Sequence, residues 1–201
     1  LCACGVTDQS QTSSVSTEPT GEPMRVEPMP SEIDLNALRD DTLAVSFDAS
    51  CIKTEENQTT IDLTVYSEEL FDAVEISQMD VGDTIVVKGE PIEITSKEED
   101  GDNLVINGGE EEGGATLTSA DGGTYRYVGM DDISAYDEVG SVTLPVDETC
   151  ILTDDSNPEH PGKELSVAEL SGLNDSDFTP YNTTVQLTGG KITAIHRSYM
   201  P

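Results

Sequence analysis

The chain has 201 residues and carries 41 acidic against 9 basic side chains, a formal net charge of −32. This imbalance argues against nucleic acid as a partner, because phosphate backbones are bound by clustered lysine and arginine. It also disfavours adsorption to anionic lipid by charge alone. With 35% hydrophobic residues and no tryptophan, the composition allows one folded domain in addition to a polar tail.

A short motif at the start of the chain indicates lipid attachment. Leu1 lies three residues before Cys4, and the small residue Ala3 directly precedes that cysteine. The arrangement resembles the bacterial lipobox, and the alternative is a fragment with incidental cysteines. The resemblance implies that residues 1–5 are a signal-peptide remnant, with cleavage between Ala3 and Cys4 and a diacylglyceryl thioether on the Cys4 sulfur. Because two acyl chains suffice for stable anchoring, we expect a cell-membrane protein on the extracytoplasmic face.

Residues 6–32 are predicted to be a disordered tether. The stretch is rich in serine, threonine, proline and glutamate, and such a composition cannot bury enough apolar surface to offset the entropy of ordering. As a flexible coil it would reach roughly 30 Å, which suits a spacer that lifts a domain off a membrane. The extracytoplasmic domain is then expected over residues 33–201.

The domain is predicted to open with a short helix and to continue in strands. Ser31 can cap a helix of at most two turns, with Asp34 three residues further on. From there the apolar residues recur with a period of two, which is typical of strands with one buried face. In the first of these strands they are Leu43, Val45, Phe47, Ala49 and Cys51. After a turn at residues 53–58, they are Ile61, Leu63 and Val65 in a second strand, which completes a hairpin.

Further short strands alternate with glycine-rich turns to the end of the chain. They are expected around residues 85–88, 92–94, 104–106, 115–118, 124–128, 142–152, 183–187 and 191–196. Brief helical turns are expected at residues 67–74 and 165–173. Many short strands at close spacing predict a mainly β domain, folded as an antiparallel β-barrel or a sandwich.

Two resemblances concern this folded part. The turn Val81-Gly82-Asp83 and the tight meander after it are similar to an OB or SH3-type barrel, which by itself implies no function. The overall run is also similar to uncharacterised surface lipoproteins of gut Firmicutes. That second resemblance implies no activity and no site residues.

Cys51 and Cys150 both lie on the apolar phase of their predicted strands, so both side chains are expected to point inward. Export would permit a disulfide between them. Such a bond would close a loop of about 100 residues, worth roughly 4–5 kcal/mol in the chain-entropy account. The alternative is two buried free thiols, because cysteine also packs as a small apolar group.

The sequence carries no catalytic signature. Its only histidines, His160 and His196, do not stand at the spacing of a zinc site, and neither a nucleophile elbow nor a phosphate-binding loop is present. Residues 107–114 are rich in glycine, but three consecutive glutamates in this loop would repel a phosphate. We therefore expect this loop to be a mobile hairpin tip and expect no cofactor.

Calcium is the one metal that the sequence leaves open. Hard cations prefer carboxylate oxygens, and these are concentrated at Asp175 and Asp177 and at Asp131 and Asp132. None of these pairs belongs to a full EF-hand loop. The acidity of the chain has a simpler explanation in solubility through self-repulsion, with cation binding or a basic partner as alternatives.

Taken together, these features predict a lipid-anchored cell-surface protein that acts as a non-enzymatic binding or interaction module of the cell envelope. The ligand or protein partner is not given by the sequence. The alternative function is an envelope or polysaccharide hydrolase that uses paired carboxylates, and acidic pairs are too numerous for the sequence to single one out.

Overall fold

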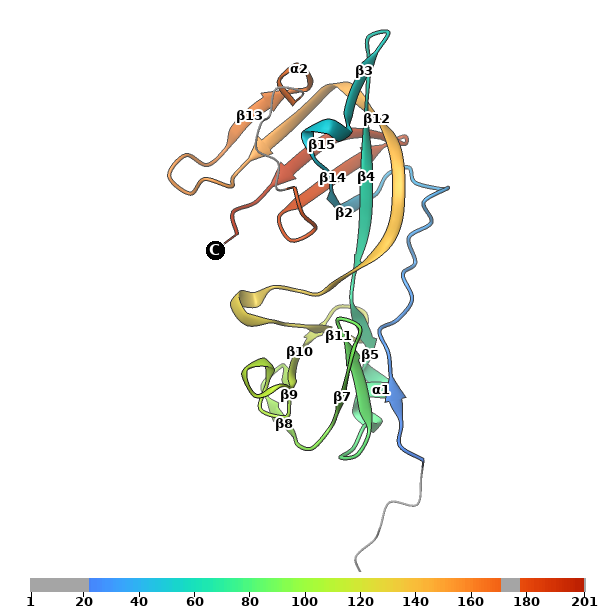
Figure 1. Ribbon diagram of the computed structural model, residues 1–201, viewed down its shortest axis with the longest axis vertical. Helices are drawn as coiled ribbons and strands as arrows, with labels where there is room; N and C mark the ends of the chain where they lie inside the picture. Colours follow the sequence, from blue (N-terminus) through green and yellow to red (C-terminus); the bar gives the residue numbers. More distant parts are fainter. Residues whose placement is uncertain (1–21, 171–177, 201) are drawn as a thin grey trace, which may run out of the picture.

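The computed structural model describes residues 22–170 and 178–200. Strands dominate, helices are short, and most strand pairs are antiparallel, so the predicted mainly β class is confirmed. The strands gather into two modules, each around its own hydrophobic core, which follow one another along the long axis of the molecule (Figure 1). We call them the larger and the smaller module.

The larger module is one seven-stranded sheet in the order β13-β12-β15-β14-β2-β4-β3. These strands are β2 (Thr42–Ser46), β3 (Ile52–Glu55), β4 (Gln58–Glu68), β12 (Tyr136–Asp154), β13 (Lys163–Ser166), β14 (Thr183–Thr188) and β15 (Lys191–Arg197). Two short helical segments accompany the sheet, η1 (Ala49–Cys51) and α2 (Val167–Leu170). The hairpins predicted at residues 43–65 and 183–196 therefore both belong to this sheet.

The long strand β12 joins two parts of this sheet. Its residues 136–145 pair with β4, and its residues 146–154 run parallel to β15. Strand β12 therefore contacts both β15 and β4, while β13 and β3 are edge strands, and the sheet does not close into a barrel. The meander after Val81 does not form the predicted OB or SH3-type barrel either, because its strands belong to two separate sheets.

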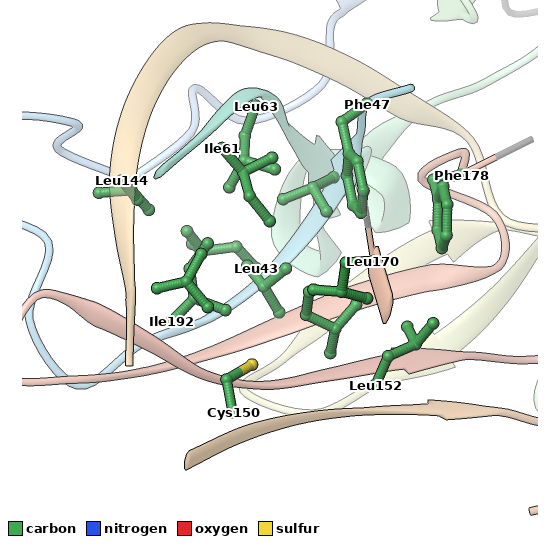
Figure 2. Packing of buried hydrophobic residues seen from close by; sticks show 14 of the residues in the cluster. Leu43, Phe47, Ile61, Leu63, Leu144, Cys150, Leu152, Leu170, Phe178 and Ile192 are labelled. Carbon is green, nitrogen blue, oxygen red and sulfur yellow. The ribbon is translucent and has the colours of Figure 1, made fainter. Parts of the chain in front are cut away.

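Alternation along the strands decides which side chains form the larger core. The apolar residues predicted to share one face of β2 and β4 are at most 2% exposed: Leu43, Val45, Ile61, Leu63 and Val65. The predicted first strand, however, ends at Ser46, since Asp48 caps η1 by accepting a hydrogen bond from the Ser50 amide. Just before that cap, the ring of Phe47 stacks on Phe178 with centroids 4.3 Å apart. Figure 2 shows this pair beside the aliphatic core.

The smaller module is inserted between β4 and β12. Its strands are β1 (Arg25–Val26), β5 (Leu70–Asp72), β6 (Thr84–Val87), β7 (Glu90–Glu93), β8 (Lys97–Asp100), β9 (Asn103–Ile106), β10 (Ala115–Ala120) and β11 (Thr124–Tyr127). They form one sheet in the order β1-β6-β7 and another in the order β5-β11-β10-β9-β8. The module also contains α1 (Ala73–Gln78), η2 (Glu110–Glu112) and η3 (Met130–Asp132). Its core includes Phe71, Ile85 and Ile106, all fully buried.

Part of the predicted tether is folded onto the smaller module. Val26 is only 1% exposed and pairs with Ile85, and the Met24 amide donates to the Asp83 carboxylate over 2.7 Å. The folded part therefore begins before residue 33. Composition missed this, because a two-residue edge strand needs only one buried side chain and backbone hydrogen bonds. Residues 6–21 lie outside the described part of the chain.

The predicted short helices differ in the structure for local reasons. Residues 31–38 form a turn, in which the Asp34 carboxylate accepts from the Asn36 amide, rather than a helix. In the segment predicted at residues 67–74, strand β4 continues to Glu68, and helix α1 starts only where Asp72 can cap it. The segment predicted at residues 165–173 is divided between β13 and α2, and its last three residues are not described.

The loop at residues 107–114 is held by hydrogen bonds rather than standing free as a hairpin tip. The Asn107 side-chain oxygen accepts from the Thr95 and Ser96 amides over 2.7 and 3.1 Å. Its side-chain nitrogen donates to the Glu93 carbonyl over 2.8 Å. These bonds place η2, and with it Glu110, in a defined position.

Candidate functional site

A pocket of about 320 Å³ lies where the two modules meet. The smaller module contributes Lys88, Glu110 and Tyr127, and the larger module contributes Tyr181 and Met200. The segment that leads back into β12 adds Met130, Ile133 and Ser134. We call this site the junction pocket, because neither module forms it alone.

Exposed apolar side chains gather at the mouth of the junction pocket. The described residues include eight large apolar side chains that are exposed, and three of them line this pocket: Met130 at 63%, Tyr181 at 48% and Met200 at 36%. Exposed apolar residues that stand together, rather than singly, mark surfaces that bind something. Methionine adapts its shape easily, and tyrosine offers an aromatic face, so this mouth suits an apolar group of a ligand.

One end of the pocket is polar and partly open to solvent, since the side chains of Lys88 and Glu110 are 52% and 32% exposed. The Lys88 ammonium donates to Glu110 Oε1 over 3.2 Å and to the Tyr127 hydroxyl over 3.4 Å. The same ammonium lies 4.9 Å from the centre of the Tyr127 ring, within the range of a cation–π contact. Oppositely charged groups therefore stand side by side at one end of an otherwise apolar pocket.

The surroundings of these groups fix their charges. Hydrogen bonds from the Tyr127 hydroxyl and the Met130 amide hold the pKa of Glu110 below its ordinary value, so this carboxylate is ionised at neutral pH. Burial raises the pKa of Tyr127, which keeps its hydroxyl neutral. Burial works against the charge of Lys88, but hydrogen bonds to Glu110 and Tyr127 nevertheless raise its pKa, so it remains cationic.

A tight hairpin places Lys88. Lys88 and Gly89 connect β6 to β7, and both have a positive φ, at 54° and 75°. Two such residues in a row are typical of the type I′ turn that suits twisted strands. The Lys88 amide donates to both carboxylate oxygens of Glu69, each over 3.0 Å. The turn residue that enters the pocket is thus fastened by its backbone to the start of the insertion.

Glu69 is a buried acid at the junction of the modules. Glu69 is only 2% exposed. Burial raises its pKa, the Lys88 amide lowers it, and a hydrogen bond with the neighbouring acid Asp137 raises it further. The net effect raises the pKa of Glu69 from its ordinary value of 4.5. The folded state therefore binds a proton on the Glu69 carboxyl group more strongly than the unfolded state does.

Glu69→Gln is expected to raise the free energy of unfolding at pH 7. A folded-state pKa above the unfolded value means that ionised Glu69 costs stability at high pH, and this cost disappears as pH falls through the raised pKa toward 4.5. Glutamine keeps an acceptor for the Lys88 amide and adds a donor for Asp137. Urea unfolding of both proteins from pH 7.5 to 4.5 should show an advantage for the variant that shrinks as pH falls. An advantage that grows toward low pH would contradict this assignment.

The calcium candidates are not brought together by the described structure. Asp175 and Asp177 lie outside the described residues, and Asp131 lies in η3. Asp132 is exposed and has a left-handed backbone with φ of 61°. Within residues 22–170 and 178–200, no three histidine, cysteine, aspartate or glutamate side chains are grouped so as to hold a metal ion. Cys4, the predicted lipidation site, also lies outside the described part.

Cys51 and Cys150 are both free thiols in the structure, and of the two only Cys150 is buried, whereas Cys51 is half-buried. Both contact the larger core, and Figure 2 shows the Cys150 sulfur among the aliphatic side chains. Burial raises the pKa of Cys150 to about 11. At neutral pH this side chain is therefore protonated and acts as an apolar core residue.

The other predicted polar residues have structural roles. His196 Nε2, on strand β15, lies 2.8 Å from Asp155 Oδ2 just after β12, and the His160 amide closes a turn with the Asn157 carbonyl. Glu69 and Asp137 are neighbouring acids at the junction of the modules, and Asp137 contributes to the raised pKa of Glu69. The hydrolase alternative remains a prediction without a described pair that favours it.

The sequence did not single out the junction pocket. Lys88 and Glu110 are 22 residues apart in the chain, and the sequence predicts a strand end at the first and a loop at the second. Tyr181 and Met200 come from the other module. The one available signal was Lys88-Gly89, a turn that places one of only nine basic side chains at a defined position.

Comparison of the chain with protein-family models, with curated proteins and with solved structures finds no match. A separate search of the described residues finds no helix long and apolar enough to cross a membrane. The function is therefore inferred from the residues and their geometry.

Proposed function

We propose that this protein is a lipid-anchored, extracytoplasmic binding module that takes a small ligand in the junction pocket. The observation that carries the proposal is the pocket itself, which combines exposed Met130 and Tyr181 with the Lys88–Glu110 ion pair at its polar end. Binding sites for small molecules commonly combine an apolar lining with a few convergent polar groups, and they often lie between domains. Such pockets commonly measure about 300–1,000 Å³. The junction pocket, at about 320 Å³, is at the small end of this range.

A neutral solvatochromic dye such as Nile red tests whether the pocket binds. We expect saturable fluorescence with the native protein and a clear loss with Met130→Ser, because the serine removes apolar surface from the mouth. Val74→Ser is the matched control, since Val74 is also 63% exposed but lies outside the pocket. Equal dye binding by the two variants would overturn the assignment of the pocket.

The anchor is tested separately through Cys4. The lipobox resemblance leads us to expect that the native precursor partitions into detergent and that Cys4→Ala releases the protein or leaves it unprocessed. Two acyl chains give stable anchoring, so the loss should be nearly complete rather than graded. Metabolic labelling with a fatty acid reads this out, and unchanged labelling of Cys4→Ala would refute lipidation at this cysteine.

A further inference from the structure

We propose that the ligand of the junction pocket is a free α-amino acid with an apolar side chain. This inference rests on the proposed function, because it names the chemistry of the molecule that the pocket would take. It is carried by charge complementarity at the polar end of the pocket and by the exposed apolar side chains beside it.

The Lys88–Glu110 pair complements a zwitterion. An ammonium has three donors, and the described bonds to Glu110 and Tyr127 use two of them. A carboxylate has about four acceptor sites, and Glu110 accepts from Lys88, Tyr127 and the Met130 amide. The described contacts thus leave one Lys88 donor and one Glu110 acceptor site for a ligand. A ligand carboxylate can accept from Lys88, and a ligand ammonium can donate to Glu110.

The spacing favours charges that are carried on one carbon atom. The Lys88 nitrogen and the Glu110 oxygen are 3.2 Å apart, so their two partners must also lie close together. An α-amino acid has its ammonium and carboxylate on the same carbon, whereas a peptide separates its terminal charges by at least one further residue. The pocket volume of about 320 Å³ likewise suits a ligand of this small size.

The serine in the pocket lining, Ser134, is already engaged within the protein. The Ser134 hydroxyl donates to a carboxylate oxygen of Glu68 and accepts from the Arg126 guanidinium over 2.9 Å. Selectivity for the ligand side chain therefore comes from the apolar residues Met130, Ile133 and Met200. An aliphatic, thioether or aromatic side chain would replace water against them.

The net charge of the protein also favours a ligand without net charge. At −32, the protein repels anions at long range, so a ligand without net charge is favoured over an anionic one. A zwitterion avoids this penalty and still forms two charge-assisted hydrogen bonds.

Isothermal titration of the native protein with L-leucine, L-methionine and L-phenylalanine tests this inference. We expect saturable binding of these amino acids. Isopentylamine and 4-methylpentanoate, which each keep only one of the two charges of leucine, should bind at least about tenfold more weakly. Lys88→Met and Glu110→Gln should each weaken amino-acid binding by about tenfold or more. Lys53→Met is the matched control, because Lys53 forms a similarly exposed ion pair with Asp62, away from the pocket.

The outcomes separate the ligand class from the proposed function. If Nile red binds at the pocket but no amino acid does, the ligand class is wrong and the pocket stands. Isopentylamine or a dipeptide such as Leu-Leu binding as tightly as leucine would also overturn the inference, the first by removing the need for a carboxylate and the second by removing the need for adjacent charges. If neither the dye nor an amino acid binds at the pocket, both proposals fail.

Discussion

Gly114→Ala is expected to destabilise the smaller module by more than about 3 kcal/mol. A Cβ atom at this position would lie 1.9 Å from the carbonyl oxygen of Ile106 and 2.8 Å from the Cβ of Asn107. Ile106 is fully buried at the end of β9, so the backbone cannot yield without disturbing the β9–β10 pairing. Urea unfolding followed by circular dichroism measures the change.

Gly113→Ala is the matched control for this clash. Gly113 has a φ of +81°, and a Cβ there would meet nothing within 4 Å. The alanine side chain therefore meets no neighbour, and the variant should lose only the stability that a left-handed backbone costs a non-glycine residue, about 1 kcal/mol. Similar losses for the two variants would mean that β9 and β10 can move apart freely, which would contradict the tight approach described above.

Phe47→Ala is expected to cost the larger module about 3–5 kcal/mol. Phe47 is 6% exposed, stacks on Phe178 at 4.3 Å, and its amide donates to the Phe178 carbonyl. Truncation removes both the buried ring and the surface on which Phe178 rests. Tyr199→Ala is the control, because Tyr199 is 53% exposed and its loss should change stability by less than about 0.5 kcal/mol.

These two substitutions act on different cores, so they also report on cooperativity. If the modules unfold separately, Gly114→Ala should move one transition and Phe47→Ala the other. A single transition moved by both variants would show that the modules unfold together. Phe47→Ala leaving the unfolding midpoint unchanged would contradict the role of the aromatic stack.

The sequence predicted the strands of the larger module because their burial repeats every second residue. Leu43, Val45, Ile61 and Leu63 alternate with polar residues, and a sheet with one buried face requires this pattern. The interruption at Asp48 was missed, because the capping side chain competes with the strand through a local hydrogen bond that alternation does not register.

The pairing of strands and the position of the pocket could not be predicted in the same way. The two halves of β12 have different partners, and the choice depends on contacts with β4 and β15 that are distant in the chain. Only the folded chain brings Lys88 and Tyr181 to one pocket. Neither residue stands out locally, since a lysine in a turn and a tyrosine before a strand are common surface residues.

The route of the chain between the modules determines how the segment between β4 and β12 could be replaced by another sequence. The insertion leaves β4 after Glu68 and rejoins β12 at Tyr136, two residues that pair with each other, and the Glu69 amide donates to the Ala135 carbonyl over 2.9 Å. The entry and exit points of the insertion are thus one hydrogen bond apart. A segment of different length or sequence could replace residues 69–135 without altering the register of β4 and β12, but it would also have to supply a new partner for strand β1, whose Val26 pairs with Ile85. Since the insertion supplies Lys88 and Glu110 while the larger module supplies Tyr181, such exchange would alter the charged end of the pocket and leave that part of its apolar wall in place.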